Sequence, residues 1–443
     1  MINHKFIDLF AGCGGLSLGL TLAGFQGKFA IERDPMAFET FSENFLGNRK
    51  VPITKFSWPS WLEQRAWGID DLLAEHYDQL INLQGKVSIL AGGPPCQGFS
   101  FAGKRQESDP RNMLFEKYAR VVDAIKPSAL VLENVPGMKV AHCNKEGDAD
   151  VCGRTAESYY EKLKKSLESI GYEVQGHVID ASRFGVPQKR SRLIVIGLRN
   201  DIAAWLEDGI DRVFVLLETM RLAQLAKLRL PESISAEDAI SDLRVNSRLL
   251  QSCNDPYSPP GYIEAVYTGP STTYQKLMHR HCRIDAMDSM RLTKHSDEVR
   301  KRFALILKEC ARGVMMSKGN RERYGLKKHR IHPMSPNEPA PTLTTLPDDV
   351  LHYAEPRILT VRESARLQSF PDWFRFRGKF TTGGTRRTKE CPRYTQVGNA
   401  VPPLLACSIG LAISAALEEA KKAQDTRRST GRGFDQEKTP AIA

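Results

Sequence analysis

A cysteine early in the chain has the setting of a nucleophile. Cys96 follows the apolar run 87–91, which predicts a short buried strand, and the stiff glycine-proline step 92–95. Open α/β folds place their ligands at this edge of the sheet, so the thiol would lie beside a ligand site. The loop after it carries glycines and the cations Lys104 and Arg105. A thiol followed by a flexible basic loop suits covalent chemistry on an anionic polymer.

A glycine turn and an acidic residue near the N-terminus indicate a nucleotide-binding unit. The predicted strand 6–10 runs into the glycine-rich turn 11–15, after which a helix begins. Glycines let a ligand approach the backbone, and the first turn of a helix offers free N–H groups. Glu32 ends the second predicted strand, 28–31, where an acidic side chain holds a ribose hydroxyl pair. Ser17 replaces the third glycine of the dinucleotide fingerprint, which argues against a Rossmann dehydrogenase.

An acidic side chain reaches the same edge of the predicted sheet, and two arginines lie farther along the chain. The apolar strand 129–132 delivers Glu133 there, and Arg190 and Arg192 stand where the last predicted strand, 192–198, begins. A surface ion pair is the alternative interpretation of the two arginines.

Alternating strands and helices up to residue 200 predict the fold class. Helices are expected over 35–45, 112–125 and 155–170, between the predicted strands. This alternation favours a doubly wound, mostly parallel α/β sheet of Rossmann-like type. The stretch 47–80 is expected to pack onto the core as an insertion through Trp58, Trp61 and Trp67.

The α/β alternation stops after residue 200, which indicates a second domain. We expect a catalytic domain over 1–200, completed by a small-residue helix within 394–420. A smaller, irregular domain is expected over 201–393. The charged end of the chain, 421–443, is expected to be disordered.

Composition limits the partners and the compartment. The 443 residues carry a net charge of +11, which favours a polyanionic partner. Nine scattered cysteines, an odd number, argue for a reducing cytosol. The N-terminus has no signal-peptide core and no membrane span is expected, so we place the chain in the cytoplasm. Histidines and cysteines at 142–152 and 279–282 fit no strong zinc pattern, so no metal is expected.

Six ordered segments together resemble the motifs of the cytosine-5 DNA methyltransferases. The resemblance covers about residues 4–415 and keeps the family's order and spacing. A single Pro-Cys-Gln segment would be weak evidence for the family, whereas six ordered segments are strong evidence. The segments are 8–15, 93–100, 133–135, 188–192, 359–371 and 398–403.

The resemblance implies S-adenosylmethionine as the methyl donor. The residues carried over to its site are Phe10, Ala11, Gly12, Gly14, Gly15, Leu16, Glu32, Arg33, Pro95, Asn399 and Ala400. Two features depart from the family pattern. Arg33 replaces the usual apolar or aromatic side chain over the adenine. The aspartate of the third motif has no clear equivalent in 50–70, and Asp70 and Asp71 are no more than candidates for it.

The resemblance also implies the reaction. Cys96 would add to carbon 6 of a cytosine, so that carbon 5 can attack a sulfonium methyl group. Glu133 would hold a proton at ring nitrogen 3, and Arg192 with Arg190 would brace the ring oxygen and the backbone. The base must be flipped out of the duplex, because its carbon 5 is otherwise out of reach. The loop residues expected near the DNA strand are Gln97, Ser100, Lys104 and Arg105.

The implied substrate is double-stranded DNA, read in the major groove by 201–393 as a target-recognition domain. The basic stretch 318–330 is a candidate phosphate contact. The compact size favours a monomeric bacterial or phage methylase of a restriction-modification system, with a restriction endonuclease as its possible partner. Two alternatives stay open. One is a tRNA cytosine-5 methyltransferase, which the long second domain disfavours. The other is a catalytically silent DNA-binding regulator, which the intact Cys96, Glu133 and Arg192 argue against.

Overall fold

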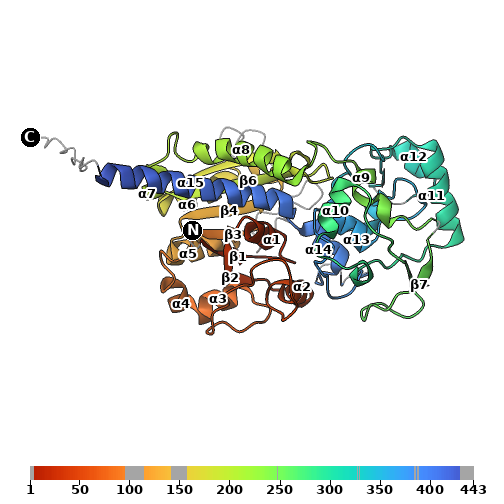
Figure 1. Ribbon diagram of the computed structural model, residues 1–443, viewed down its shortest axis with the longest axis horizontal. Coiled ribbons are helices and arrows are strands. Elements are labelled where there is room, and N and C mark those ends of the chain that lie inside the picture. Colours follow the sequence, from red (N-terminus) through yellow and green to blue (C-terminus); the bar gives the residue numbers. More distant parts are fainter. Residues whose placement is uncertain are drawn as a thin grey trace, which may run out of the picture.

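The computed structural model has two lobes, a larger one built around a sheet and a smaller, mostly helical one (Figure 1). It describes residues 4–94, 114–140, 157–246, 248–326, 328, 330–383, 386 and 389–429. The last long helix, α15, returns from the smaller lobe and runs along the larger one (Figure 1). The larger lobe is therefore built from both ends of the described chain.

A six-stranded sheet lies at the centre of the larger lobe, in the order β2-β1-β3-β4-β6-β5. The first four strands in this order are mutually parallel, and β6 runs antiparallel to β4 and β5. The predicted doubly wound, mostly parallel α/β sheet is thus confirmed, with one reversed strand. The strands are β1 Lys5–Leu9, β2 Gln26–Ile31, β3 Ile89–Gly92, β4 Ala129–Asn134, β5 Tyr172–Asp180 and β6 Ser191–Arg199.

Helices cover both faces of this sheet, because successive strand residues point to opposite sides. Phe6 and Ile89 belong to one buried cluster, and their neighbours Ile7 and Leu90 belong to another. The first face is covered by α1 Gly15–Leu22, α2 Pro35–Phe45, α8 Asp211–Leu228 and α15 Pro403–Ser429. The second face is covered by α3 Ile69–Glu75, α4 Tyr77–Ile81, α5 Leu114–Ile125 and α6 Tyr159–Ser169.

The chain order creates a crevice at one edge of the sheet. From β1 the chain moves to β2 on one side and later returns to β3 on the other side. The carboxyl ends of β1 and β3 therefore form a topological switch point, where open α/β sheets bind ligands. The segments that follow both strands belong to the predicted site.

The stretch 47–80 packs onto the sheet through its tryptophans, as predicted. Trp67 is buried, and the rings of Trp58 and Trp61 meet Phe29 of β2 edge-on, at 6.4 and 5.6 Å between centroids. These contacts join the stretch to the second face of the sheet.

The smaller lobe consists of short elements. Its helices are α9 Ala236–Ile240, α10 Thr273–His279, α11 Asp297–Glu309, α12 Lys318–Arg323, α13 Val361–Leu367 and α14 Arg393–Asn399. Its strands are β7 Leu250–Ser252, β8 Ile263–Ala265, β9 His332–Pro333 and β10 Val350–Leu351. The short helix α7 Asn200–Ala203 and the 3₁₀ turns Pro136–Lys139, Ala181–Phe184, Ser241–Leu243, Ile284–Ala286 and Pro347–Asp349 complete the described elements of the chain.

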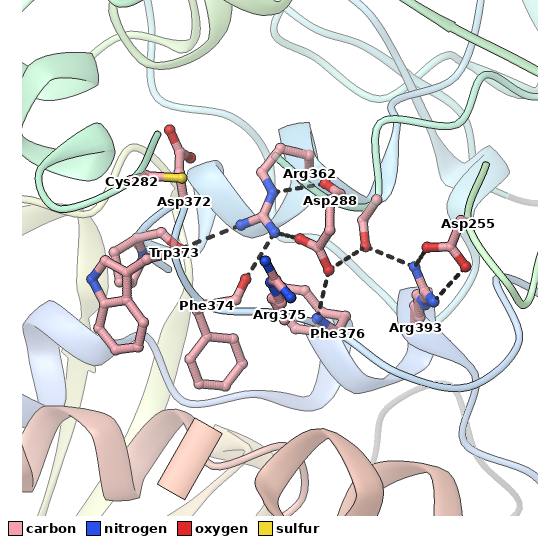
Figure 2. Close-up of polar contacts among 12 residues, drawn as sticks. Asp255, Cys282, Asp288, Arg362, Asp372, Trp373, Phe374, Arg375, Phe376 and Arg393 are labelled. Carbon is pink, nitrogen blue, oxygen red and sulfur yellow. Dashed lines mark hydrogen bonds and ion pairs between the residues drawn. The ribbon is translucent and has the colours of Figure 1, made fainter. Parts of the chain in front are cut away.

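Buried arginines hold the smaller lobe together. Arg362 pairs with Asp288, and Arg393 pairs with both carboxylate oxygens of Asp255, at 2.6 and 2.9 Å (Figure 2). Burial lowers the pKa of Arg362 to about 10. A buried charge is tolerated only when it is paired and hydrogen-bonded, so these pairs determine how the loops of this lobe pack.

The structure bears on two of the expected boundaries. α8 packs along α15 in the larger lobe, so we propose that the domain boundary lies after α8 and not at residue 201 (Figure 1). α15 also continues to Ser429, so residues 421–429 are helical where disorder was expected. The rest of that charged end lies outside the described residues.

The α14–α15 segment is unusually apolar for its length. Among the described residues, Arg393–Ser429 contains a stretch long and apolar enough to cross a membrane. However, 72% of that stretch is buried inside the molecule, so α15 is a core helix.

α1 and α15 approach so closely that glycine is required at their contact. A Cβ atom on Gly19 would lie 2.3 Å from Ala406 Cβ and 2.6 Å from Pro403 O. A Cβ atom on Gly410 would likewise lie 2.7 Å from Ala23 Cβ. Neither helix can take a larger side chain here without moving away from the other.

Gly19→Ala is therefore expected to lower the melting temperature, although alanine favours a helix by about 1 kcal/mol. The added methyl group overpacks the α1–α15 contact, at a cost of about 1–3 kcal/mol. Gly319→Ala in α12 is the matched control, because nothing lies within 4 Å of its Cβ position. Thermal melting that ranks Gly19→Ala at or above Gly319→Ala would contradict this account of the contact.

Candidate active site

The end of β3 lies directly beside Glu133 of β4. A Cβ atom on Gly93 would lie 3.8 Å from Glu133 Oε2, and Asn134 Nδ2 donates to the carbonyl of Pro94 at 3.2 Å. The chain therefore leaves β3 along the carboxyl end of β4. The predicted nucleophile Cys96 and the cofactor-site residue Pro95 follow at once but lie outside the described residues, as do Gln97, Ser100, Lys104 and Arg105.

Glu133 and Arg192 form a pair at this edge. Residues two positions before Glu133 and two after Arg192 belong to the same buried cluster, so both side chains extend from one face of the sheet. Arg192 Nε lies 2.7 Å from Glu133 Oε1, and the exposed fractions of the two side chains are only 13% and 11%. No group among the described residues donates a hydrogen bond to Oε1, so the contact with Arg192 is an ion pair and not an aligned hydrogen bond. One carboxyl oxygen is thus held by charge and can accept a further donor.

Arg190 has different neighbours from Arg192. It is buried, and its guanidinium donates to the carbonyls of Leu343, Gly398 and Ala400 at 3.2, 2.9 and 3.1 Å. The sequence grouped the two arginines as catalytic residues, but the structure brings only Arg192 to Glu133. Contact of Arg190 with a substrate stays a prediction.

The glycine turn between β1 and α1 adopts left-handed backbone conformations. Phe10, Gly12 and Gly14 have φ values of 60°, 56° and 96°. Gly14 N donates to Ala11 O at 2.9 Å, which closes the turn. At Gly14 a side chain is also excluded by space, because its Cβ would lie 2.4 Å from the ring of Phe45. The turn therefore brings backbone, not side chains, to the switch point, and the buried Leu16 follows in α1.

Glu32 is held beside this turn by two backbone bonds. Its Oε2 accepts from Gly12 N at 2.9 Å, and its Oε1 accepts from Asp34 N at 2.8 Å. Each carboxylate oxygen can accept a second hydrogen bond, so the carboxyl group is oriented and still able to bind a pair of hydroxyls. Burial raises the pKa of Glu32 above its ordinary value.

The chain returns to the turn near its C-terminus. A Cβ atom on Gly15 would lie 2.3 Å from Val401 O and 3.3 Å from Ala400 Cβ, so the segment after α14 covers the start of α1. Asn399 beside it is exposed. The structure thus brings together the two predicted halves of the cofactor site, more than 380 positions apart.

Three other predicted cofactor-site residues have separate surroundings. Arg33 is exposed beyond β2. Asp71 accepts from Gly68 N at 3.3 Å, and Asp70 pairs with Lys117 on α5 at 2.5 Å. The residue that contacts the end of β2 is Trp67, whose backbone N–H donates to Glu32 O at 2.9 Å. These contacts therefore do not assign either aspartate to the third motif.

Asp8 lies beneath the glycine turn in a contact that the sequence analysis did not predict. It is 1% exposed, Ser17 Oγ donates to its Oδ2 at 2.6 Å, and its Oδ1 has no hydrogen-bond donor. Burial raises its pKa from 3.8 to about 7. Ser17 could have indicated this contact in the sequence. It replaces the third glycine of the dinucleotide fingerprint, and a hydroxyl group at that position indicates a polar partner beneath the turn.

The basic stretch 318–330 is largely paired within the smaller lobe. Lys318 lies 3.8 Å from Glu322, Arg323 lies 2.8 Å from Glu309, and Lys328 pairs with Asp348. These contacts reduce the positive charge available to a DNA phosphate. Binding of DNA by this stretch stays a prediction.

The histidines and cysteines considered for zinc are not grouped in the part of the chain that the structure describes. No set of three or more His, Cys, Asp or Glu side chains there is arranged so that it could hold a metal ion. His279 instead contacts Asp372, at 2.8 Å. His142, Cys143 and Cys152 lie outside the described residues.

The raised pKa of Asp8 predicts how stability depends on pH. Its neutral form is favoured in the fold, so its contribution is full below about pH 4 and is lost as the pH rises through about 7. Asparagine cannot ionise, and its oxygen can still accept from Ser17. The melting temperature of Asp8→Asn relative to the wild type should therefore rise between pH 5 and pH 8, corresponding to roughly 2–3 kcal/mol. Asp123→Asn on α5, an exposed aspartate, should show no such trend.

Comparisons with known proteins agree on one family. The family model described as C-5 cytosine-specific DNA methylase matches residues 4–415. The type II methyltransferase M.DdeI of Desulfomicrobium norvegicum is 31% identical over 439 residues, covering 97% of this chain and 92% of the relative. The type II methyltransferase M1.HphI of Haemophilus parahaemolyticus is 30% identical over 418 residues, covering 93% and 87%.

Solved structures show the same fold. A prophage protein of E. coli, assigned as a DNA modification methyltransferase, superposes with a TM-score of 0.61 at 25% identity and covers 94% of this chain and 100% of its own. The S. pombe Dnmt2 methyltransferase superposes with a TM-score of 0.50 at 17% identity, covering 94% and 99%, which bears on the fold alone. The sequence match over nearly the whole chain and the Rossmann-like sheet lead to one conclusion: the chain belongs to the C-5 cytosine-specific DNA methylase family, as a methyltransferase of the type II kind.

Proposed function

We propose that this chain methylates carbon 5 of a cytosine in a specific double-stranded DNA sequence, with S-adenosylmethionine as methyl donor. One observation carries the proposal: the Glu32 turn and the Glu133–Arg192 pair lie at the same edge of one sheet, on either side of the strand that leads to Cys96. A donor site and an acceptor site must adjoin for a direct methyl transfer.

The residues around the glycine turn fit S-adenosylmethionine. The oriented carboxylate of Glu32 suits the ribose hydroxyls, and the N–H groups at the start of α1 suit a carboxylate. Asn399 and Ala400 close the site from the other side of Gly15. The bound cofactor would supply a methyl group on a sulfonium, which is a strong electrophile.

Cys96 is the proposed nucleophile. It is the second residue after Pro94, the last described residue beyond the end of β3. Its thiolate would form a bond to carbon 6 of the cytosine, which makes carbon 5 electron-rich enough to attack a methyl group. After transfer, loss of the proton from carbon 5 breaks the sulfur–carbon bond and frees the enzyme.

Glu133 and Arg192 are the proposed partners of the cytosine ring. Addition of the thiolate places negative charge on ring nitrogen 3, and a protonated Glu133 would neutralise it by donating its proton. Arg192 lies against the same carboxyl group and would donate to the ring oxygen. The pair is partly withdrawn from water, where such interactions are stronger than at an open surface.

The DNA must present a single base to this edge, so we propose that the target cytosine is flipped out of the duplex. The loop residues Gln97, Ser100, Lys104 and Arg105 are proposed to contact the strand around it. The smaller lobe would then read the sequence as the target-recognition domain. We further propose a monomeric enzyme of the bacterial cytoplasm that protects DNA against a cognate restriction endonuclease, as the names of its type II relatives suggest.

Transfer of labelled methyl groups tests the reaction. Wild-type protein should label duplex DNA and not tRNA, and Cys96→Ser should abolish the label because serine is a far weaker nucleophile. Sequencing of the product would identify the site. Label found only in tRNA would assign the chain to RNA, and DNA binding without any label would make it a silent regulator.

The roles of Glu133 and Arg192 predict losses in the chemical step. Glu133→Gln should lower kcat by about 10²–10⁴, because an amide cannot supply the proton. Arg192→Lys should lower kcat by about 10–10³, because a lysine lacks the planar set of donors. Arg183→Lys is the matched control, since Arg183 forms an exposed pair with Glu218 at 3.0 Å. Unchanged kcat in Glu133→Gln under single-turnover conditions would exclude the proposed role.

A further inference from the structure

We propose that Arg190 is a positioning residue for the cofactor site and does not touch the cytosine. With Gln188 it forms a clamp, defined here as the side chains of these two residues and the backbone groups they hold. The inference rests on the proposed function, because it assigns the segment 398–400 to the S-adenosylmethionine site.

The clamp holds one residue of the smaller lobe at both of its backbone groups. Gln188 Oε1 accepts from Leu343 N at 3.0 Å, and Arg190 Nη1 donates to Leu343 O at 3.2 Å. Gln188 is fully buried, and its Nε2 donates to Leu367 O at 3.3 Å. The two side chains therefore pair both the backbone N–H and the backbone carbonyl of Leu343.

The other side of the clamp holds the segment that closes the cofactor site. Arg190 Nη2 donates to Gly398 O at 2.9 Å and to Ala400 O at 3.1 Å. These carbonyls lie at the carboxyl end of α14, where unpaired carbonyls and the helix dipole favour a cation. Ala400 in turn packs on Gly15 at the start of α1.

The two held segments also touch each other. A Cβ atom on Gly398 would lie 2.2 Å from Thr344 O, so α14 ends directly against the strand-like segment around Leu343. The planar guanidinium group of Arg190 contacts both segments at this junction. Lysine could not reproduce the arrangement, since its donors radiate from a single atom while the carbonyls come from two separate segments.

The backbone of Arg190 is itself anchored, which makes the clamp rigid. Arg190 N donates to Asp180 Oδ1 at 3.2 Å, and Arg190 O accepts from Ala181 N at 3.0 Å. Arg192, two residues later, has entered β6 and extends to Glu133. The Gln-x-Arg-x-Arg pattern thus divides into two clamp residues and one residue that faces the site.

Binding and rate measurements separate the two roles. For the full chain, the dissociation constant of S-adenosylmethionine should rise about tenfold or more in Arg190→Lys, because a charged hydrogen-bond set is lost from the cofactor segment. Its kcat at saturating cofactor should fall much less than its cofactor affinity. Arg192→Lys should show the opposite split, with kcat reduced and the dissociation constant within about twofold of the wild type.

Amide hydrogen exchange on the protein without cofactor supplies a readout independent of activity. Peptides covering 340–346 and 396–402 should exchange faster in Arg190→Lys, whereas a peptide over β4 should not change. Gly398→Ala provides a second disruption of the same junction and should give the same pattern if Arg190→Lys does not fold. Wild-type protein that neither binds S-adenosylmethionine nor methylates DNA would overturn the proposed function itself. A competent wild type whose Arg190→Lys and Gly398→Ala variants bind cofactor normally would overturn the clamp alone.

Discussion

The close packing of α15 on α1 is the contact on which the rest of the molecule depends. Gly19 and Gly410 let the two helices approach until the small side chains Ala406 and Ala23 touch the opposite backbone. Because α15 follows the smaller lobe in sequence, this contact closes the larger lobe only after the chain has passed through the smaller one. It thereby sets the segment 398–401 over the glycine turn, and both halves of the proposed cofactor site come together only in the complete fold.

Hydrogen bonds and an ion pair orient the partly buried carboxyl groups at the sheet edge. Glu32 is oriented by backbone N–H groups, whereas Glu133 is oriented by the guanidinium of Arg192. Each carboxyl group keeps acceptor capacity that its described neighbours do not use. An edge of this kind strengthens electrostatic interactions with a ligand, because little water competes for the same groups.

Buried arginines hold the smaller lobe together, and one of them, Arg190, also joins it to the larger lobe. Arg190, Arg362, Arg366 and Arg393 are among the largest fully buried side chains of the described chain. Arg366 lies between Asp242 and Asp372, at 3.1 and 2.6 Å, and although burial opposes it, this pairing keeps the pKa of Asp372 below its ordinary value. Loss of one partner would leave a buried charge unpaired, which typically costs about 3–5 kcal/mol. Such pairs allow few alternative packings, so they fix how the loops of the smaller lobe pack.

Local patterns were sufficient for much of the fold and part of the site. The strands, α2, the glycine turn, Glu32 and Glu133 follow from apolar alternation and from the rule that parallel strands end at one edge. The sequence alone therefore determined the α/β sheet, its family resemblance and the edge at which we propose that the chemistry takes place. The tertiary structure decided that Arg190 and Arg192 separate, that Ser17 bonds Asp8 and that α8 joins the larger lobe. The physical reason is that Arg190 contacts carbonyls more than 150 positions away, and backbone carbonyls have no residue-specific signal in a sequence.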